Sequence, residues 1–183
     1  MGNGLGRAVL RGSLASVAGI LAMDAFFRRI RRVGSARPAG DHRRSNRAGG
    51  RLDDISLVGR RAREGEPSTE AVGRLAYRAV KGEDPTEPTR RRLGKAVHWG
   101  YGMAVGGLYG LLRPDREDDG AVGDGLGYGT ALWLFGDELA VPLLGLAKGP
   151  TAVSTRTHAE ALGAHLVYGL ATATATKALR RVL

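Results

Sequence analysis

A run of 17 residues, Ala96–Leu112, contains no Asp, Glu, Lys or Arg, and His98 is its one ionisable side chain of the charge-carrying types. Its second part, Met103–Leu112, has no polar face repeating every 3.6 residues, although a helix on the surface of a soluble protein carries one. The run is also rich in glycine, and each glycine costs a helix in water up to about 1 kcal/mol. Both properties favour a helix that crosses a membrane.

Three further segments have a similar length and composition. A bilayer core requires about 20 residues of helix, and each segment supplies them. The four predicted spans are residues 5–30, 93–112, 120–147 and 159–179. The sequence therefore predicts an all-α fold, a four-helix transmembrane bundle, with a long basic loop over residues 31–92. A soluble four-helix bundle is the alternative for the same segments.

The net positive charge of the chain comes from that loop and its two ends. Of 28 basic and 18 acidic residues, 19 basic and 9 acidic ones fall between Arg28 and Lys95, which leaves 9 of each elsewhere. A net charge of +10 spread over a soluble domain would suggest nucleic acid. Because the charge is confined to a loop without a recognition module, we expect anionic lipid, and not nucleic acid, as its partner.

The basic loop divides into two parts. Residues 32–50 are rich in Arg, Gly and Ser and are predicted to be disordered. Residues 70–81 predict a short amphipathic helix on the inner leaflet, with three basic side chains toward lipid headgroups. These three are Arg74, Arg78 and Lys81. Arginine clusters at both ends of the loop predict a cytoplasmic loop and place both termini outside.

Small residues recur at steps of four in the predicted spans. Small residues at this spacing let helix backbones approach closely in lipid, where packing drives association. The glycines expected to pack helices together are Gly102, Gly106, Gly110, Gly125, Gly129 and Gly169. The stripes predict a compact bundle and are also compatible with a homo-oligomer or with a larger membrane complex.

Ionisable residues within the spans are the candidate functional residues. A charge at the centre of a membrane helix costs at least about 2.5 kcal/mol, so such a side chain usually faces a partner inside the bundle. The predicted polar network consists of Asp24, His98, Asp137, Glu138, Glu160 and His165. The motif His-x-x-Tyr-Gly occurs at both histidines, and antiparallel helices would bring a carboxylate to each: Asp24 to His98, and Asp137 or Glu138 to His165.

Three roles are open for this network. Histidine–carboxylate hydrogen bonds could fix the bundle, or the groups could relay protons or ions. His98 and His165 could instead ligate a metal or a haem in a bis-histidine bundle. Enzymatic chemistry is not expected, because an intramembrane hydrolase would need a Ser, metal or Asp-pair arrangement and Asp24 with Asp137 is the one candidate. Apart from the bis-histidine hypothesis, no cofactor is expected.

Four segments resemble the YagU-like family of bacterial inner-membrane proteins at the level of the superfamily. They are "AGILAMD" (18–24), "AVHWGYGMAVGGLYGLL" (96–112), "VPLLGL" (141–146) and "HAEALGAHLVYG" (158–169). The resemblance implies a multi-pass protein of the inner membrane, and a link to acid tolerance that is known for some members. It implies no established reaction. A structural or assembly subunit of a larger complex is the alternative.

Overall fold

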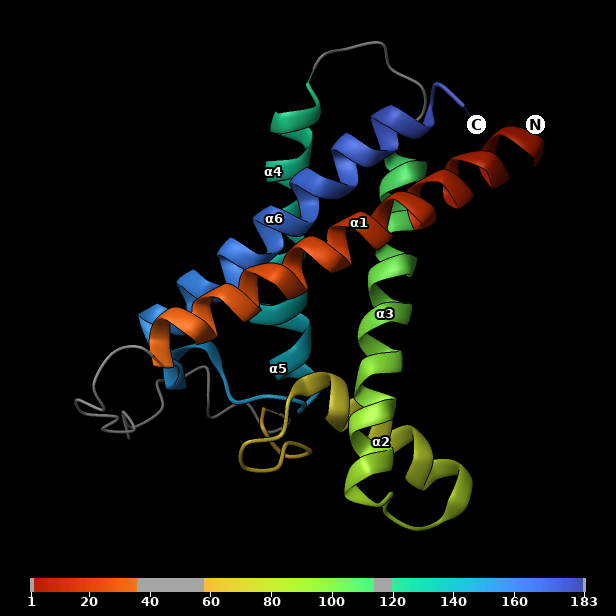
Figure 1. Ribbon diagram of the computed structural model, residues 1–183. Coiled ribbons are helices and arrows are strands. Elements are labelled where there is room, and N and C mark those ends of the chain that lie inside the picture. Colours follow the sequence, from red (N-terminus) through yellow and green to blue (C-terminus); the bar gives the residue numbers. More distant parts are fainter. Residues whose placement is uncertain (1, 36–57, 114–119, 183) are drawn as a thin grey trace. The chain divides into compact units, whose positions relative to one another are not determined.

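The computed structural model describes residues 2–35, 58–113 and 120–182, and every regular element in these ranges is a helix (Figure 1). The elements are α1 (Gly2–Ser35), α2 (Ser68–Lys81), α3 (Glu87–Leu112), α4 (Ala121–Ala131), the π-helix η1 (Leu132–Ala140), α5 (Val141–Leu143), the 3₁₀-helix η2 (Pro150–Ala152) and α6 (Thr155–Leu179). The prediction of an all-α fold is confirmed for these residues. Most of the segment predicted to be disordered, residues 36–50, lies outside the described ranges.

The described chain forms two compact units. The first unit contains α1, α4, nearly all of α6 and the second part of α3, beginning at Gly102. The second unit contains α2, the first part of α3 up to Tyr101, and the segment from Leu134 in η1 to η2. The basic loop and the predicted spans are therefore not separate folding units, because the second predicted span contributes to both.

Local sequence signals explain where the helices end. Gly82 ends α2 in the left-handed conformation, with φ of 77°, and its N–H donates to the carbonyl oxygen of Arg78 at 2.8 Å. Ser154 precedes α6, and its Oγ accepts from the N–H of Thr157 at 3.2 Å. The predicted helices at 70–81 and 159–179 fall within these elements.

The segment "PLLGL" of the family resemblance forms a helix C-terminus. Gly145 has φ of 76°, its N–H donates to Pro142, and the N–H of Leu146 donates to Val141 at 3.0 Å. These two bonds make a Schellman motif, which satisfies the last carbonyl groups of α5. The Pro-x-x-Gly-Leu pattern therefore has a structural explanation in this chain.

The third predicted span, residues 120–147, is helical from Ala121 to Leu143 but changes its winding on the way. Its middle part, η1, is a π-helix between the two α-helical parts. Pro142 lacks an N–H, and in an α-helix its ring would collide with the carbonyl group of Glu138. A wider turn before the proline avoids this collision.

Among the described residues, one helix is long and apolar enough to cross a membrane, at Gly4–Val33 within α1. A core helix of a soluble protein or a signal sequence can satisfy the same criterion, but only 39% of the most apolar part of this helix is buried. The helices α3 and α6 are long, yet their Gly, Tyr, Thr and His residues lower the hydropathy.

Candidate functional site

In the first unit, α1 and α3 meet at glycine. A Cβ atom added to Gly106 would overlap the Ser16 side chain, and one added to Gly110 would overlap the carbonyl oxygen of Ala8. At Gly102 the added atom would lie 2.8 Å from the Ile20 side chain. Only glycine permits backbones to approach this closely. The structure thus places the three predicted glycines of this helix against one partner, α1.

The helices α4 and α6 meet in the same way. A Cβ added to Gly125 would lie 2.8 Å from the carbonyl oxygen of Gly169, and one added to Gly129 would overlap that of His165. On a neighbouring face of α6, Gly19 of α1 leaves room for the side chains of Tyr168 and Thr172. The six glycines predicted to pack helices together therefore lie at helix–helix contacts of the first unit.

Two tyrosine hydroxyls tie these helices to α3. The buried Tyr168 of α6 donates to the carbonyl oxygen of Gly102 at 2.6 Å. Tyr128 of α4 donates to the carbonyl oxygen of Val105, and its ring lies 4.9 Å from the ring of Tyr109. Carbonyl groups inside a helix normally have only their intrahelical partner, so these bonds use a second lone pair. Sequence periodicity did not indicate either bond.

The predicted polar residues are divided between the units. Asp24, Glu160 and His165 belong to the first unit and are half-buried. Nδ1 of His165 lies 2.9 Å from the carbonyl oxygen of Ala161, one turn earlier in α6. The predicted pairs, Asp24 with His98 and Glu138 with His165, join residues of different units and stay predictions.

The other three polar residues lie in the second unit. His98 is half-buried on α3, with its Nε2 atom inside the protein. Asp137 and Glu138 lie on η1, and Asp137 acts electrostatically on Tyr101 of α3. The Tyr101 hydroxyl would lie 3.3 Å from a Cβ added to Gly136. In this unit α3 carries His98, the π-helix η1 carries the two carboxylates, and the two helices lie side by side at Tyr101 and Gly136. Segments of π-helix are frequent at functional sites.

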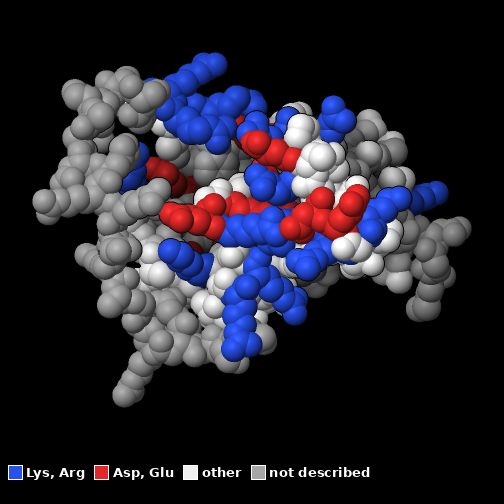
Figure 2. Space-filling model, turned by 90° about the horizontal axis from the view of Figure 1, so that it is seen from below, with Lys and Arg blue, Asp and Glu red and all other residues white. Residues whose placement is uncertain are grey.

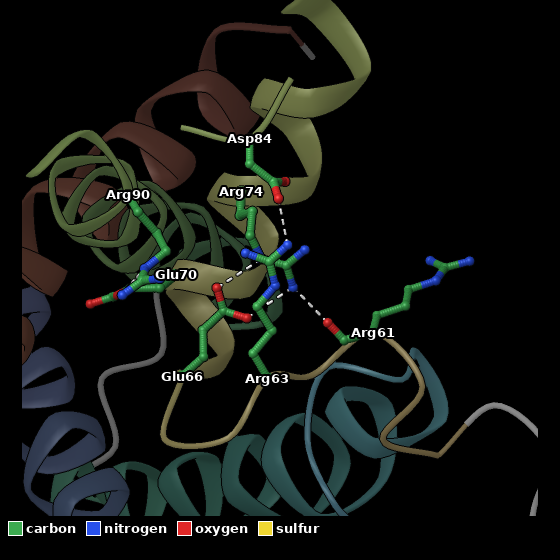
Figure 3. A network of polar contacts seen from close by, with 7 residues as sticks. All are labelled: Arg61, Arg63, Glu66, Glu70, Arg74, Asp84 and Arg90. Atoms are coloured by element: carbon green, nitrogen blue, oxygen red, sulfur yellow. Dashed lines mark hydrogen bonds and ion pairs between the residues drawn. The ribbon is translucent and has the colours of Figure 1, made fainter. Parts of the chain in front are cut away.

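A network of ion pairs holds α2 in the second unit (Figure 3). The Arg74 guanidinium binds both carboxylate oxygens of Glu66, at 2.8 and 2.9 Å, and the carbonyl oxygen of Arg61 at 2.6 Å. Both side chains are buried, Arg74 with 4% and Glu66 with 2% of its surface exposed. The hydrogen bond from Arg74 holds the pKa of Glu66 below its ordinary value, against the opposing effect of burial, and the same bond raises the pKa of Arg74.

Two further pairs extend this network. Arg90 of α3 donates to Glu70 of α2 at 2.9 Å, in a half-buried position. Arg63 donates to Asp84 at 2.5 Å, and this bond lowers the pKa of the exposed Asp84. Figure 2 shows acidic side chains lying directly beside basic ones. Part of the positive charge of the basic loop is therefore neutralised inside the folded unit.

The structure corrects the sequence analysis at Arg74. This residue was expected to face lipid headgroups, but it is buried and bound by Glu66. The spacing of charged residues identifies the charged side of α2, but it does not show that a carboxylate eight residues earlier covers Arg74. Arg78 and Lys81, the other two predicted headgroup residues, are exposed.

Within the described ranges, no group of three or more His, Asp or Glu side chains could hold a metal ion. The bis-histidine hypothesis for His98 and His165 joins the two units and is tested by the absorption spectrum of the purified protein. No protein-family model, curated protein or solved structure matches the chain. The resemblance to the YagU-like family therefore rests on the quoted residues alone.

Sequence reasoning did not identify two features of the candidate sites. The π-helix has a sequence signal, the proline Pro142 inside a segment that is otherwise predicted to be one continuous helix. The buried pair Glu66–Arg74 has a weaker signal, an acidic residue directly before Pro67 and the start of α2. Neither signal specifies a chemical function without the structure.

Proposed function

We propose that the protein is a multi-pass inner-membrane protein whose spans are α1, α3, the continuous helix from α4 to α5, and α6. One observation carries this proposal: in the first unit the buried residues are mostly small, and the leucines are half-buried or exposed. None of the described leucines of this unit is buried. In water such an arrangement would expose the residues that drive folding, whereas in lipid it is the expected one.

The buried positions of the first unit show this preference directly. The small ones are Gly12, Ala15, Ser16, Gly19, Gly102, Gly106, Gly107, Gly110, Gly125, Gly129, Ala164, Gly169, Thr172, Ala173 and Thr176. The larger ones are Arg11, Ile20, Met23, Tyr109 and Tyr168. On the outside, Leu10, Leu112 and Val122 expose 56%, 64% and 62% of their surface. A bilayer would cover these side chains.

Reporter fusions test the topology. With the loop of residues 31–92 in the cytoplasm, alkaline phosphatase fused after Leu112 is active and a fusion after Lys81 is inactive. The reverse result would invert the orientation. Release of the full-length protein from membranes by alkaline carbonate would contradict the membrane-spanning proposal itself.

The activity we propose is the handling of protons or ions by the ionisable residues of the spans. It is supported by half-buried His98 and His165, and by Asp137 and Glu138 on the π-helix. Histidine changes its charge near physiological pH and carboxylates can pass protons. The family resemblance, with its link to acid tolerance, agrees with this activity.

Proton flux into vesicles containing the purified protein tests this activity. A relay predicts pH-dependent flux that His98→Gln or His165→Gln abolishes while the thermal stability stays unchanged. A purely structural histidine predicts unchanged flux and a loss of about 1 kcal/mol of stability. His158→Gln, near the start of α6, is the matched control and leaves the flux intact. Wild-type flux equal to that of empty vesicles would overturn the proposed activity.

A further inference from the structure

The helix α2 is oriented in the second unit with a charged residue inside and apolar residues outside. It buries Ala71, Gly73 and the charged Arg74, and it leaves an apolar stripe outside. Val72 and Val80 expose 36% and 80% of their surface. Ala76 and Ala79 complete the stripe, because positions i, i+4, i+7 and i+8 share one face of a helix. The side of α2 that faces away from the unit is therefore its apolar side.

The contacts of Arg74 explain why α2 keeps this orientation about its own axis. Its guanidinium is bound by Glu66 and by the carbonyl oxygen of Arg61, both within the same unit. Turning the stripe inward would expose this pair and leave the two glycine contacts, Gly73 with Leu93 and Gly94 with Glu70, unmade. The outward stripe is thus fixed by the fold of the unit and is exposed for contact with an apolar environment outside it.

The contacts of α2 with α3 specify where that environment lies. They involve Arg90, Leu93 and Gly94, just before the uncharged run of α3 begins at Ala96. If α3 enters a bilayer at the start of this run, α2 lies at the level of the headgroups. This step rests on the membrane-spanning fold proposed above.

Exposed basic side chains indicate the charge of that surface. Arg78 and Lys81 on α2, and Arg92 and Lys95 at the start of α3, are exposed. Among the described residues no ion pair holds these four, whereas Arg63, Arg74 and Arg90 each bind a carboxylate. Basic residues near a membrane surface attract anionic lipid, each by about fivefold in the binding equilibrium.

We propose that α2 is an interfacial helix that docks on an anionic bilayer surface, with Val72, Ala76, Ala79 and Val80 inserted at the headgroup boundary and Arg78 and Lys81 among the phosphates. An interfacial helix of this kind combines an apolar face with basic residues and depends on both. Arg74 holds the helix in place and does not contact lipid.

Fluorescent labels at single cysteines test this docking, since the chain contains no cysteine of its own. The full-length protein carries the label at Val80→Cys, or at Leu108→Cys in the proposed span, and is reconstituted into vesicles containing lipids with a quencher near the headgroup or in the acyl chain. We expect headgroup quenching at position 80 in phosphatidylglycerol vesicles, several-fold weaker in phosphatidylcholine, and acyl-chain quenching at position 108 in both.

Charge variants test the role of the basic residues. Arg78→Gln combined with Lys81→Gln should abolish most of the several-fold preference of position 80 for anionic vesicles, since each of the two residues contributes about fivefold to the docking equilibrium. Arg91→Gln is the matched control, because Glu87 already pairs with Arg91, and it should change the preference far less.

The outcomes separate this inference from the proposed function. Quenching at position 108 without quenching at position 80 would overturn the docking of α2 and leave the membrane-spanning fold standing. Absence of quenching at both positions would overturn both proposals. Equal quenching at position 80 in neutral and anionic vesicles would overturn the anionic surface. Protection of the position-80 label in lipid-free detergent, together with dimer formation, would assign the stripe to a second copy of the chain instead.

Discussion

The two units of this protein bring helices together by opposite means. In the first unit, α1 meets α3, and α4 meets α6, at glycines whose missing side chains let backbones touch. In the second unit, α2 is held on the start of α3 and on the preceding loop by arginine–carboxylate pairs, one of them buried. Backbone contacts depend on shape alone, whereas buried ion pairs depend on both partners being charged. Each mechanism therefore fails under a different perturbation.

The largest effect is expected where a buried charge loses its partner. Arg74→Met leaves Glu66 without its cation in the interior, and we expect the opening free energy of α2 to fall by about 4 kcal/mol. Hydrogen exchange of the α2 amides in the purified protein measures this quantity. Arg91→Met, in the exposed pair with Glu87, should cost less than about 1 kcal/mol.

The same site offers a second variant that distinguishes charge from packing. Replacing both partners, Arg74→Met with Glu66→Leu, removes the charges together and should restore most of the lost protection. If the double variant is as unstable as Arg74→Met alone, the pair does not hold α2 as the comparison requires.

In the first unit the matching experiment adds a side chain. Gly106→Leu forces α1 and α3 apart where the Ser16 side chain now fits, and we expect a loss of about 3 kcal/mol in unfolding followed by circular dichroism. Gly100→Leu on the same helix is the control, since nothing lies within 4 Å of that position. It should leave stability unchanged or raise it slightly, because leucine favours helix over glycine. Equal losses at both positions would contradict glycine packing.

These two sites show what a sequence can and cannot predict. The glycines at 102, 106 and 110 follow the period of one helix, so their shared face could be predicted from spacing alone. The amphipathic character of α2 could be predicted in the same way, but not which face is buried. That depends on Glu66 and on the backbone of Arg61, which reach Arg74 from the preceding loop. The spacing of residue types along a helix predicts that its two faces differ, but it does not predict what packs against each face.

The candidate polar site follows the same rule. The ionisable residues of the spans could be identified from composition, because a charge in an apolar run is conspicuous. Their partners could not, since antiparallel packing gives only an approximate depth. The structure places the Tyr101 hydroxyl beside Gly136 of η1 and Nδ1 of His165 beside the carbonyl oxygen of Ala161 in its own helix, contacts that no pattern in the sequence indicates.

Acid should weaken the second unit by protonating Glu66, whereas the glycine contacts of the first unit contain no group that acid can protonate. The pKa of Glu66 in the folded protein is below its ordinary value of 4.5, so its stabilisation is fully present above that value. It is lost as the pH falls through the lower folded pKa. Protection of α2 from hydrogen exchange, corrected for the intrinsic rate, should therefore fall below about pH 4.5. The double variant without the pair should show a flatter profile, and a profile unchanged by its removal would count against Glu66.

The smallest effect concerns a hydroxyl at a glycine contact of the first unit. Thr172 is fully buried against Gly19, and its Oγ1 has no hydrogen-bond partner among the described residues, whereas Thr176 donates to the carbonyl oxygen of Thr172 at 2.8 Å. Thr172→Val keeps the shape and removes an unpaired polar group, so stability should stay constant or rise by up to about 1 kcal/mol. Thr176→Val loses a bond and should cost about 0.6 kcal/mol. Thermal unfolding of both variants in the same detergent measures the difference. If Thr172→Val is the more damaging of the two, its hydroxyl contributes to the packing of α1 on α6, and shape alone no longer describes the first unit.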